Sequence, residues 1–467
     1  MQGMRGGVFW PCWKNEQGVA VVVKAQESVD QCYRLEPGGR LRGRFRIPGD
    51  KSISHRAVML GSLAVGETRV TGFLDGADAL ATLAAFRAMG VDIQGPDAGR
   101  LRIQGVGMDG LQAPAEPLDL GNSGTSMRLL CGLLCGQSFD VVLAGDGSLS
   151  ARPMRRVTEP LAQMGAAIHA TDAGTAPLLI HGGQALTGIQ YEMPVASAQV
   201  KSALLLAGLY ASGETWVREP APTRDHTERM LEGFGYPVLR ERCGWVGLEG
   251  GGCLRAVDID IPGDISSAAF FVVGACIAMD SEVVIEHVGV NPTRTGVLDI
   301  LSLMGADIEL RNRGHAGGEP VADLHVKSSN LRGIRIPERM VPLAIDEFPA
   351  LFVAAACAEG STVLTGAEEL RVKESDRIAV MAEGLQALGI DAEPRPDGMA
   401  ITGGRLRGGR IRSHGDHRIA MSFAMAGLRA REEIVVEDCA NVGTSFPGFA
   451  DLARESGLRI RVEGGTA

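Results

Sequence analysis

Aromatic residues are scarce in this chain: Phe, Trp and Tyr together make up 4% of its 467 residues. Such a composition does not suit a platform of rings on which nucleic acid bases stack. Positive charge is also in the minority, because the formal net charge is −10. A general nucleic-acid binder needs a basic surface, so no nucleic acid partner is expected. A local group of Arg and Lys can still bind a small anion inside an acidic protein.

Long apolar runs and paired cysteines are missing as well. No apolar run approaches the ~20 residues that span a bilayer, and the stretch 19–23 ends at Lys24 without the features of a signal peptide. We therefore expect a cytoplasmic protein with no membrane partner. The nine Cys include no C-x-x-C pair, which favours reduced thiols buried in the core over a zinc or redox site. Cys131 and Cys135, four residues apart in an apolar run, are expected to share a helix face.

Several sequence motifs of other enzyme classes do not occur. There is no G-x-x-x-x-G-K-[ST] phosphate loop, no H-E-x-x-H and no G-x-S-x-G elbow between a strand and a helix. The segment Gly121-Asn-Ser-Gly-Thr125 is not a Rossmann fingerprint. Nothing points to a metal, and no cofactor is expected.

A repeat with a period near 70 residues organises the chain. An apolar helix end, a Gly and a strand recur, and neighbouring glycines are separated by 68 to 84 residues at positions 90, 165, 235, 305, 389 and 457. A glycine suits the left-handed residue that closes a helix before a strand. Six units with alternating helices and strands predict an α/β protein, and 467 residues predict two domains of three units each. Residues 1–36 stand outside the period and are interpreted as an N-terminal extension.

The first helix of each unit is expected to begin at a Gly, Asp, Asn or Ser. These residues cap helices and leave backbone N–H groups free to attract an anion. Capping alone explains any single unit, but cations stand at the same places. They are Lys51, Arg56, Arg152, Arg224, Lys373, Arg377 and Arg418. Cations at turns can bind phosphate or carboxylate, and the nearby Asp346 and Glu374 are either plain ion-pair partners or a general base and acid.

These segments together resemble a known family. Gly49-Asp-Lys-Ser-Ile-Ser-His-Arg56, Gly121-Asn-Ser-Gly-Thr-Ser-Met-Arg128, Ser150-Ala-Arg-Pro-Met154, Arg371-Val-Lys-Glu-Ser-Asp-Arg377 and Gly415-Asp-His-Arg418 are similar to signature segments of the 5-enolpyruvylshikimate-3-phosphate (EPSP) synthases. The resemblance runs from about Leu35 to about Arg461. Several long motifs in the same order make it specific.

The resemblance implies a fold, a division into domains and a reaction. The fold is the two-domain enolpyruvyl transferase fold of six βαβαββ units, three per domain, also described as an inside-out α/β barrel. Residues 37–50 with 265–467 would form one domain and residues 51–264 the other, with the active site in the cleft between them. The reaction moves the enolpyruvyl group of phosphoenolpyruvate onto the 5-hydroxyl of shikimate 3-phosphate, through a tetrahedral intermediate, and releases phosphate. It serves chorismate and aromatic amino acid biosynthesis without a metal or cofactor, and a monomer is expected.

The resemblance also assigns site residues by motif. Shikimate 3-phosphate would contact Lys51, Ser52, Arg56, Ser197, Ala198, Gln199, Arg224, Asp346 and Lys373. Phosphoenolpyruvate would contact Lys51, Gly124, Arg152, Gln199, Arg377 and Arg418. Asp346 would take the proton from the 5-hydroxyl, while Glu374 with Lys51 would supply and remove protons at the enolpyruvyl carbons.

Four positions bear on how complete this site is. Ala198 replaces a Ser, Thr444 stands where many members carry a phosphoenolpyruvate-binding Lys, and Leu129 replaces a Pro. Glyphosate-insensitive relatives carry Ala at the position of Gly124. We therefore expect that Gly124 leaves room for glyphosate and that the compound inhibits.

Two alternatives stay open at this point. The other enolpyruvyl transferase, which acts on UDP-N-acetylglucosamine, shares the fold and carries a Cys shortly before an Arg-Pro pair, where this chain has Gly147. A binding protein without activity would have lost Asp346, Glu374, Lys51 or Arg152, and all of them are present.

Overall fold

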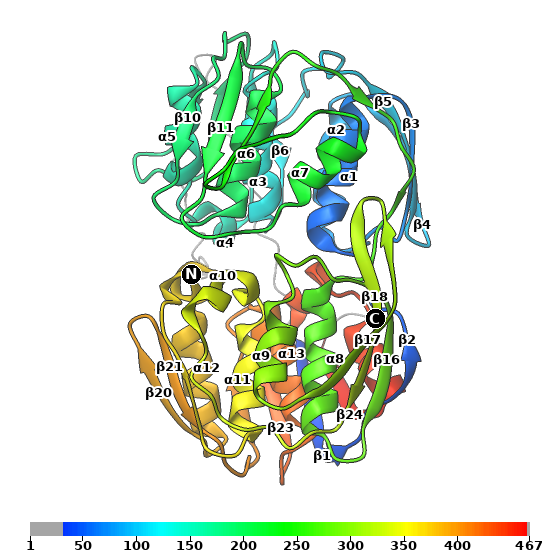
Figure 1. Ribbon diagram of the computed structural model, residues 1–467, viewed down its shortest axis with the longest axis vertical. Coiled ribbons are helices and arrows are strands. Elements are labelled where there is room, and N and C mark those ends of the chain that lie inside the picture. Colours follow the sequence, from blue (N-terminus) through cyan, green and yellow to red (C-terminus); the bar gives the residue numbers. More distant parts are fainter. Residues whose placement is uncertain (1–30, 465–467) are drawn as a thin grey trace, which may run out of the picture.

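The computed structural model describes residues 31–464, and within that range the strands form six separate sheets. The buried apolar side chains of this range gather in two cores. We call the part around the core from Ile53 to Ile261 the upper half. The part whose core runs from Tyr33 to Ile47 and from Ile265 to Ile460 is the lower half, as Figure 1 shows them. The predicted α/β class with six units is confirmed, whereas the exact domain boundaries stay a prediction.

The upper half contains three of the sheets and the helices that pack on them. The first sheet contains β14 (Leu254–Arg255), β15 (Ile259–Asp260), β3 (Ala64–Thr71), β5 (Arg100–Val106) and β4 (Asp92–Asp97). The second has the order β6 (Leu118–Asp119), β7 (Val141–Ala144), β9 (Leu178–His181), β8 (Ala167–His169), and the third β10 (Gln190–Glu192), β11 (Glu214–Arg218), β13 (Trp245–Glu249), β12 (Leu239–Arg240). The helices are α1 (Lys51–Leu63), α2 (Ala77–Ala88), α3 (Gly124–Leu134), α4 (Gly147–Ser150), α5 (Arg155–Gln163), α6 (Ala198–Gly208) and α7 (His226–Gly233).

The lower half is built in the same way. Its sheets have the orders β17 (Asp307–Ala316), β18 (Glu319–Lys327), β16 (Glu282–Gly289), β2 (Arg42–Phe45); β19 (Ser361–Leu364), β21 (Gly398–Thr402), β20 (Asp391–Arg395); and β22 (Gly409–Arg412), β23 (Ile434–Glu437), β1 (Gln31–Gly39), β24 (Leu458–Gly464). The helices are α8 (Ile265–Ile277), α9 (Gly296–Leu303), α10 (Val341–Ala344), α11 (Phe348–Cys357), α12 (Arg377–Ala387), α13 (His417–Ala426) and α14 (Phe449–Ser456). The short turns η1 (Glu338–Met340), η2 (Glu368–Val372) and η3 (Ala440–Thr444) complete it.

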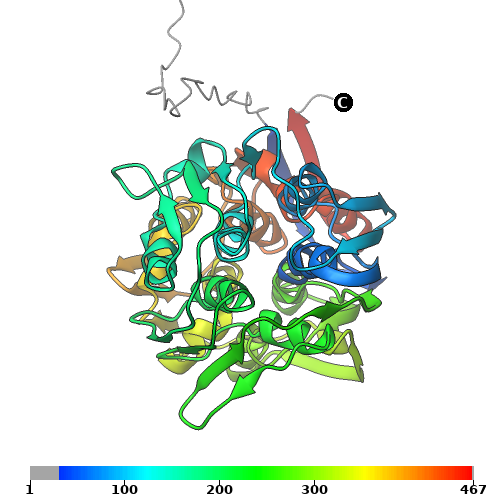
Figure 2. The same cartoon turned by 90° about the horizontal axis from the view of Figure 1, so that it is seen from above.

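Helices occupy the interior and sheets lie at the rim. Seen from above, several helices stand nearly end-on in the middle while strands lie around them (Figure 2). In the lower half α8, α11 and α13 pack on one another, and all 13 residues of α8 are buried. A helix surrounded by protein is apolar on all sides, which explains why α8 and α11 show no amphipathic stripe.

The glycines of the repeat close helices as the sequence predicts. Gly90, Gly165, Gly235, Gly305, Gly389 and Gly457 all adopt positive φ, between 78° and 115°. The capping prediction holds for five of the six first helices, where the side chains of Asp50, Ser123, Ser197, Asp264 and Asp416 accept a backbone N–H. The exception is α11, which begins at Phe348 after Glu347 and carries Pro349 in its first turn. A proline there lacks one of the N–H groups that a cap would satisfy, and Asp346 lies in the turn before the helix.

Two crossing segments join the halves side by side. The amide of Asp50 donates to the carbonyl of Pro262 at 2.8 Å, and the amide of Asp264 donates to that of Pro48 at 3.0 Å. Gly49 is required here because a Cβ would lie 1.8 Å from the carbonyl oxygen of Gly72. The starts of α1 and α8, which directly follow these segments, therefore lie close to each other.

The predicted N-terminal extension is wrong at its C-terminal end. Residues 31–36 open β1, which lies between β23 and β24 in the sheet and pairs with both. Tyr33 and Leu35 are buried in the lower core. Residues 1–30 lie outside the described part of the chain. Because the partners of β1 are about 400 residues away in sequence, no local period reveals this strand.

The cysteine prediction is confirmed for Cys131 and Cys135, which are fully buried at α3. Cys243 and Cys253 are exposed instead, before and after β13 of the upper half. Among the helices of residues 31–464, none combines the length and apolar character that crossing a bilayer requires.

Candidate active site

Asp346 lies at the meeting point of the two halves. Its carboxylate pairs with Arg224 of the upper half, and it also lies 3.4 Å from Nη1 of Arg377 and 3.8 Å from Nζ of Lys373. The residue is 8% exposed. Three cations around one nearly buried carboxylate leave local positive charge that a bound anion can offset. This arrangement depends on both halves, because Arg224 comes from the loop before α7 and the other residues come from the lower half.

The buried guanidinium of Arg377 links the acids of this region. Its Nε donates to Asp416 at 2.8 Å and its Nη2 donates to Glu374 at 2.6 Å. Burial alone would raise the pKa of Glu374, but Arg377 and the nearby Arg152 and Arg418 hold it well below its usual range. Glu374 is therefore ionised while the site holds no anion. Arg418 reaches the same place by donating to the backbone carbonyl of Asp346 at 3.1 Å.

Lys51, the first residue of α1, connects the upper half to η3. Its ammonium pairs with Asp78 of α2 and donates to the hydroxyl of Ser445 at 2.9 Å. Ser445 belongs to the lower half, so this is a second contact between the halves. Burial, with Lys51 and Arg418, lowers the pKa of the neighbouring His417 to about 3, so this imidazole is neutral near pH 7.

The start of α3 presents two arginines beside a glycine. Arg152 donates from Nη2 to Oδ1 of Asn122 at 2.5 Å, and Arg128 donates from Nη1 to Oε1 of Gln199 at 2.9 Å. A Cβ on Gly124 would lie 2.7 Å from Nη1 of Arg128 and 3.0 Å from Nη1 of Arg152. Burial and the like charge of Arg152 lower the pKa of Arg128 to about 10. Both guanidinium groups thus lie beside the start of α3, where an anion is favoured.

Comparison with known proteins identifies the family of this chain. Residues 35–452 match the model of the family EPSP synthase (3-phosphoshikimate 1-carboxyvinyltransferase). The chain is 70% identical over 429 residues to the 3-phosphoshikimate 1-carboxyvinyltransferase of Alkalilimnicola ehrlichii, covering 92% of this chain and 96% of that one. It is 67% identical to the protein of that name from Nitrosococcus oceani over the same shares of both chains.

The chain belongs to the EPSP synthase family. A solved EPSP synthase from Acinetobacter baumannii has 59% sequence identity and a TM-score of 0.84, covering 93% of this chain and 100% of that one. The enolpyruvyl transferase NikO from Streptomyces tendae, at 19% identity and a TM-score of 0.75, shares the fold. The two-domain enolpyruvyl transferase fold expected from the resemblance is confirmed.

Most residues assigned by the EPSP synthase motifs lie in the three contact regions just described. Ser197 caps α6 and precedes Ala198 and Gln199, and the amide of Gln199 also donates to Thr125 at 3.2 Å. Ser52 lies on the first turn of α1 and accepts from Arg56 through its backbone carbonyl at 2.9 Å. Their roles toward substrate stay predictions.

Arg56 has a protein partner for each of its three side-chain nitrogens. It is 4% exposed, and its remaining nitrogens donate to Thr227 at 2.6 Å and to Ser202 at 2.7 Å. Burial lowers its pKa to about 10. The same side chain therefore also holds α1 against α6 and α7.

Arg128 is a cation of the site that the motif assignment missed. It ends the EPSP synthase segment Gly121–Arg128, so a signal was present in the sequence. The expected Lys at position 444 is not replaced by a neighbouring cation from η3. Thr444 donates its hydroxyl to the carbonyl of Asn441 at 2.7 Å, within its own turn. Leu129 is fully buried in the upper core.

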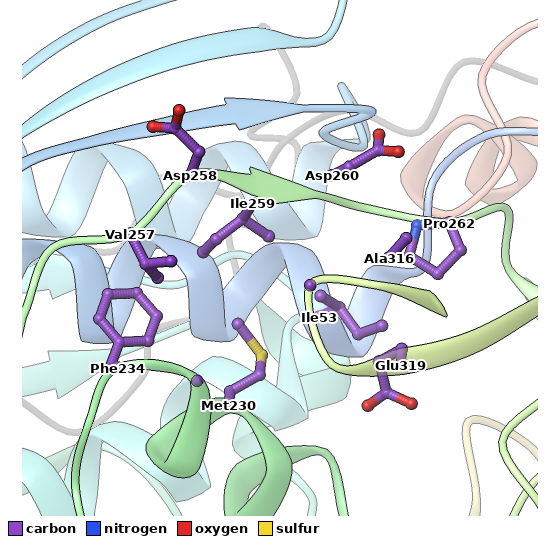
Figure 3. A pocket seen from close by; sticks show the side chains of 12 residues that line it. Ile53, Met230, Phe234, Val257, Asp258, Ile259, Asp260, Pro262, Ala316 and Glu319 are labelled. Atoms are coloured by element: carbon purple, nitrogen blue, oxygen red, sulfur yellow. The ribbon is translucent and has the colours of Figure 1, made fainter. Parts of the chain in front are cut away.

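A small cavity at the joint of the halves is separate from this site. It lies between α7, β15, the start of α1 and the turn of the β17–β18 hairpin, with Ile53, Phe234 and Glu319 among its side chains (Figure 3). Its volume of about 30 Å³ suits one water molecule and not a substrate. None of the assigned residues lines it. Residues 31–464 hold no group of three or more His, Cys, Asp or Glu arranged to bind a metal ion.

Proposed function

We propose that the charged side chains between the two halves carry out the reaction of the EPSP synthase family. The chain is an enzyme that transfers the enolpyruvyl group of phosphoenolpyruvate to the 5-hydroxyl of shikimate 3-phosphate and releases phosphate. The observation that carries the assignment of the site is the placement of Asp346 among Arg224, Lys373 and Arg377. A base for the hydroxyl and cations for the phosphates are then in one place.

The two substrates divide the assigned residues between them. For shikimate 3-phosphate we propose the set Lys51, Ser52, Arg56, Ser197, Ala198, Gln199, Arg224, Asp346 and Lys373. For phosphoenolpyruvate we propose Lys51, Gly124, Arg152, Gln199, Arg377 and Arg418, with Arg128 added because it borders Gly124. The cations offset the charge of two phosphates and a carboxylate, which favours binding and stabilises charge that develops in the reaction.

Proton transfers follow from the positions of Asp346 and Glu374. Asp346 takes the proton of the 5-hydroxyl while the oxygen of that hydroxyl bonds to C2 of phosphoenolpyruvate. C3 gains a proton in the same addition. In the elimination C3 loses a proton, the C2–O bond to phosphate breaks and the enol ether forms.

Glu374, with Lys51, is the proposed donor and acceptor at C3. Glu374 is ionised before substrates bind because cations lower its pKa. Binding of anions offsets those cations and raises that pKa, which lets the carboxyl group carry a proton.

A pH-dependent affinity for shikimate 3-phosphate is predicted from Lys373. Burial, with Arg377 and Arg224 nearby, lowers the pKa of this ammonium to about 8. The charge is present below that pH and lost above it, so the Kd for shikimate 3-phosphate should rise by up to about tenfold per pH unit between roughly pH 8 and pH 9.5. Titration calorimetry over this range measures the slope. The Lys373→Arg side chain keeps its charge over this range, so the Kd of that variant should change little with pH. A wild-type Kd that does not change between these pH values contradicts the assignment of Lys373 to shikimate 3-phosphate.

The activity is tested by phosphate release with each acceptor. Phosphoenolpyruvate with shikimate 3-phosphate should give steady phosphate release, and phosphoenolpyruvate with UDP-N-acetylglucosamine should give none. Turnover with the nucleotide sugar alone would overturn the assignment. Binding of shikimate 3-phosphate without turnover would identify an inactive binding protein. The monomeric state and the cytoplasmic location stay predictions.

A further inference from the structure

A buried polar network beside the candidate active site takes no part in the chemistry proposed above. Its centre is Arg294, which follows Asn291-Pro-Thr in the segment between β16 and α9 and is 4% exposed. Burial alone would lower the pKa of this guanidinium, but Asp50, Asp264 and Glu347 raise it above its ordinary value. The side chain is therefore a permanent buried cation, and its partners determine what it holds in place.

One arm of the network, which we call the upper arm, reaches the upper half. Nη1 of Arg294 lies 3.4 Å from Nε2 of His226, the first residue of α7. Nδ1 of His226 lies 2.7 Å from a carboxylate oxygen of Glu319, and the other oxygen of Glu319 accepts from Asn291 at 2.9 Å. Asn291 also donates to Asp225 at 2.7 Å. Asp225 and His226 directly follow Arg224, so this arm holds the loop that presents Arg224.

The upper arm depends on a hairpin of the lower half. Glu319 stands at the start of β18, just after the turn of the β17–β18 hairpin, and this hairpin extends to the upper half in Figure 1. Glu319, Met230 of α7 and Ile53 of α1 line the small cavity together (Figure 3). Both His226 and Glu319 are 2% exposed. The contact between the two halves is thus buried.

The other arm, which we call the lower arm, stays in the lower half and reaches the turn that contains Asp346. Nη2 of Arg294 donates to the hydroxyl of Ser266 at 2.7 Å, and that hydroxyl donates to the carboxylate of Glu347. Glu347 is 3% exposed and directly follows Asp346. Arg294 also lies 3.3 Å from Asp50 and 3.2 Å from Asp264, the caps of α1 and α8. One side chain therefore links the crossing segments to the residues that flank both Arg224 and Asp346.

We propose that Arg294 is a positioning residue, which aligns Arg224 with Asp346 through Glu319–His226 on one arm and Ser266–Glu347 on the other. The inference rests on the proposed function, since it assigns the network to substrate affinity and proton transfer. A displacement of either partner by even about 1 Å weakens a reaction that depends on alignment. The upper arm sets the affinity for shikimate 3-phosphate through Arg224, and the lower arm sets turnover through Asp346.

The first test removes charge from the upper arm. In Glu319→Gln, the side-chain NH2 group faces one of the two groups that donate to Glu319, His226 or Asn291. One hydrogen bond is therefore lost while the volume of the side chain is kept. We expect the KM for shikimate 3-phosphate to rise about tenfold, with kcat and the KM for phosphoenolpyruvate changed less than about twofold. Glu309→Gln is the control, because Glu309 lies exposed on the same hairpin and pairs with Arg311. In an Arg224→Ala background Glu319→Gln should have no further effect, because coupled residues are not additive.

The second test weakens the lower arm with the smallest change, since Arg294 also lies 3.8 Å from Glu347 directly. Ser266→Ala removes the hydroxyl between Arg294 and Glu347, and we expect kcat to fall about tenfold with the KM for shikimate 3-phosphate nearly unchanged. The control is Ser62→Ala, a fully buried helix serine with no hydrogen-bond partner among residues 31–464. Thermal unfolding of each variant separates a loss of stability from a loss of alignment.

The outcomes distinguish the two levels of the proposal. No phosphate release by the wild-type enzyme contradicts the proposed function. An active wild type with variants that lose only stability, or that change the KM of both substrates equally, shows a purely structural network and overturns the positioning role. Full additivity of Glu319→Gln with Arg224→Ala overturns it too. The separate changes of KM and kcat support it.

Discussion

Replacement of Asp346 by asparagine is expected to lower kcat by at least ~100-fold, within the range for loss of a general acid or base. The amide keeps the volume of the side chain but cannot accept a proton from the 5-hydroxyl. Steady-state phosphate release at saturating substrates measures the effect. Because the carboxylate also offsets Arg224, Lys373 and Arg377, the substituted site gains positive charge. The affinity for shikimate 3-phosphate should therefore not fall along with turnover.

The control for Asp346 is an exposed carboxylate of the same half. Asp391→Asn on β20 makes the same chemical change at an exposed position and should leave kcat within about twofold. Near-normal turnover of the Asp346 variant would show that the base is another group. A large loss of affinity for shikimate 3-phosphate alongside the loss of kcat would instead indicate that Asp346 maintains the structure of the site.

Gly124→Ala is expected to raise the KM for phosphoenolpyruvate and to weaken glyphosate inhibition, each by about 10- to 100-fold. The new Cβ would lie 2.7 Å from Nη1 of Arg128 and 3.0 Å from Nη1 of Arg152, so both guanidinium groups must move. A hydrogen bond to a charged group contributes about 1.5–3 kcal/mol, and 1.4 kcal/mol is tenfold in affinity. The loss of one well-aligned contact explains the expected range. Inhibition curves at low phosphoenolpyruvate measure it.

Gly233→Ala is the control for this substitution. Gly233 also lies in a helix of the upper half, at the exposed end of α7, its φ is not positive, and a Cβ there meets no atom within 4 Å. It should leave both constants unchanged. If low-micromolar glyphosate does not inhibit the wild-type enzyme at low phosphoenolpyruvate, the expectation that Gly124 leaves room for glyphosate is wrong.

Much of the fold could be predicted from the sequence because it is encoded locally. Gly90 and Gly165 end helices in a left-handed conformation that other residues adopt at a cost, so their recurrence marks the units. Asp50 and Ser123 cap helices through side chains only a few atoms long. Short-range rules of this kind are independent of the rest of the chain, and they predicted six units correctly.

Long-range pairing was where prediction failed. The period of the repeat leaves residues 31–36 outside the units, yet they form an interior strand whose partners are β23 and β24. The sequence does not single out Arg294, because its segment has no charge pattern of its own. Its importance arises from Ser266 and Glu347 on one side and His226 on the other, which only folding brings together.

By itself, the sequence determined the α/β class, the number of units and the kinds of side chain available for anion binding and proton transfer. These follow from local backbone preferences and from the chemistry of residues such as Lys51 and Glu374. Only the tertiary structure decided that Arg224 faces Asp346 across the two halves and that Lys51 reaches Ser445. The reason is physical: a charge acts over a few ångströms, and distances between residues more than a hundred positions apart are set by how the two cores pack and join.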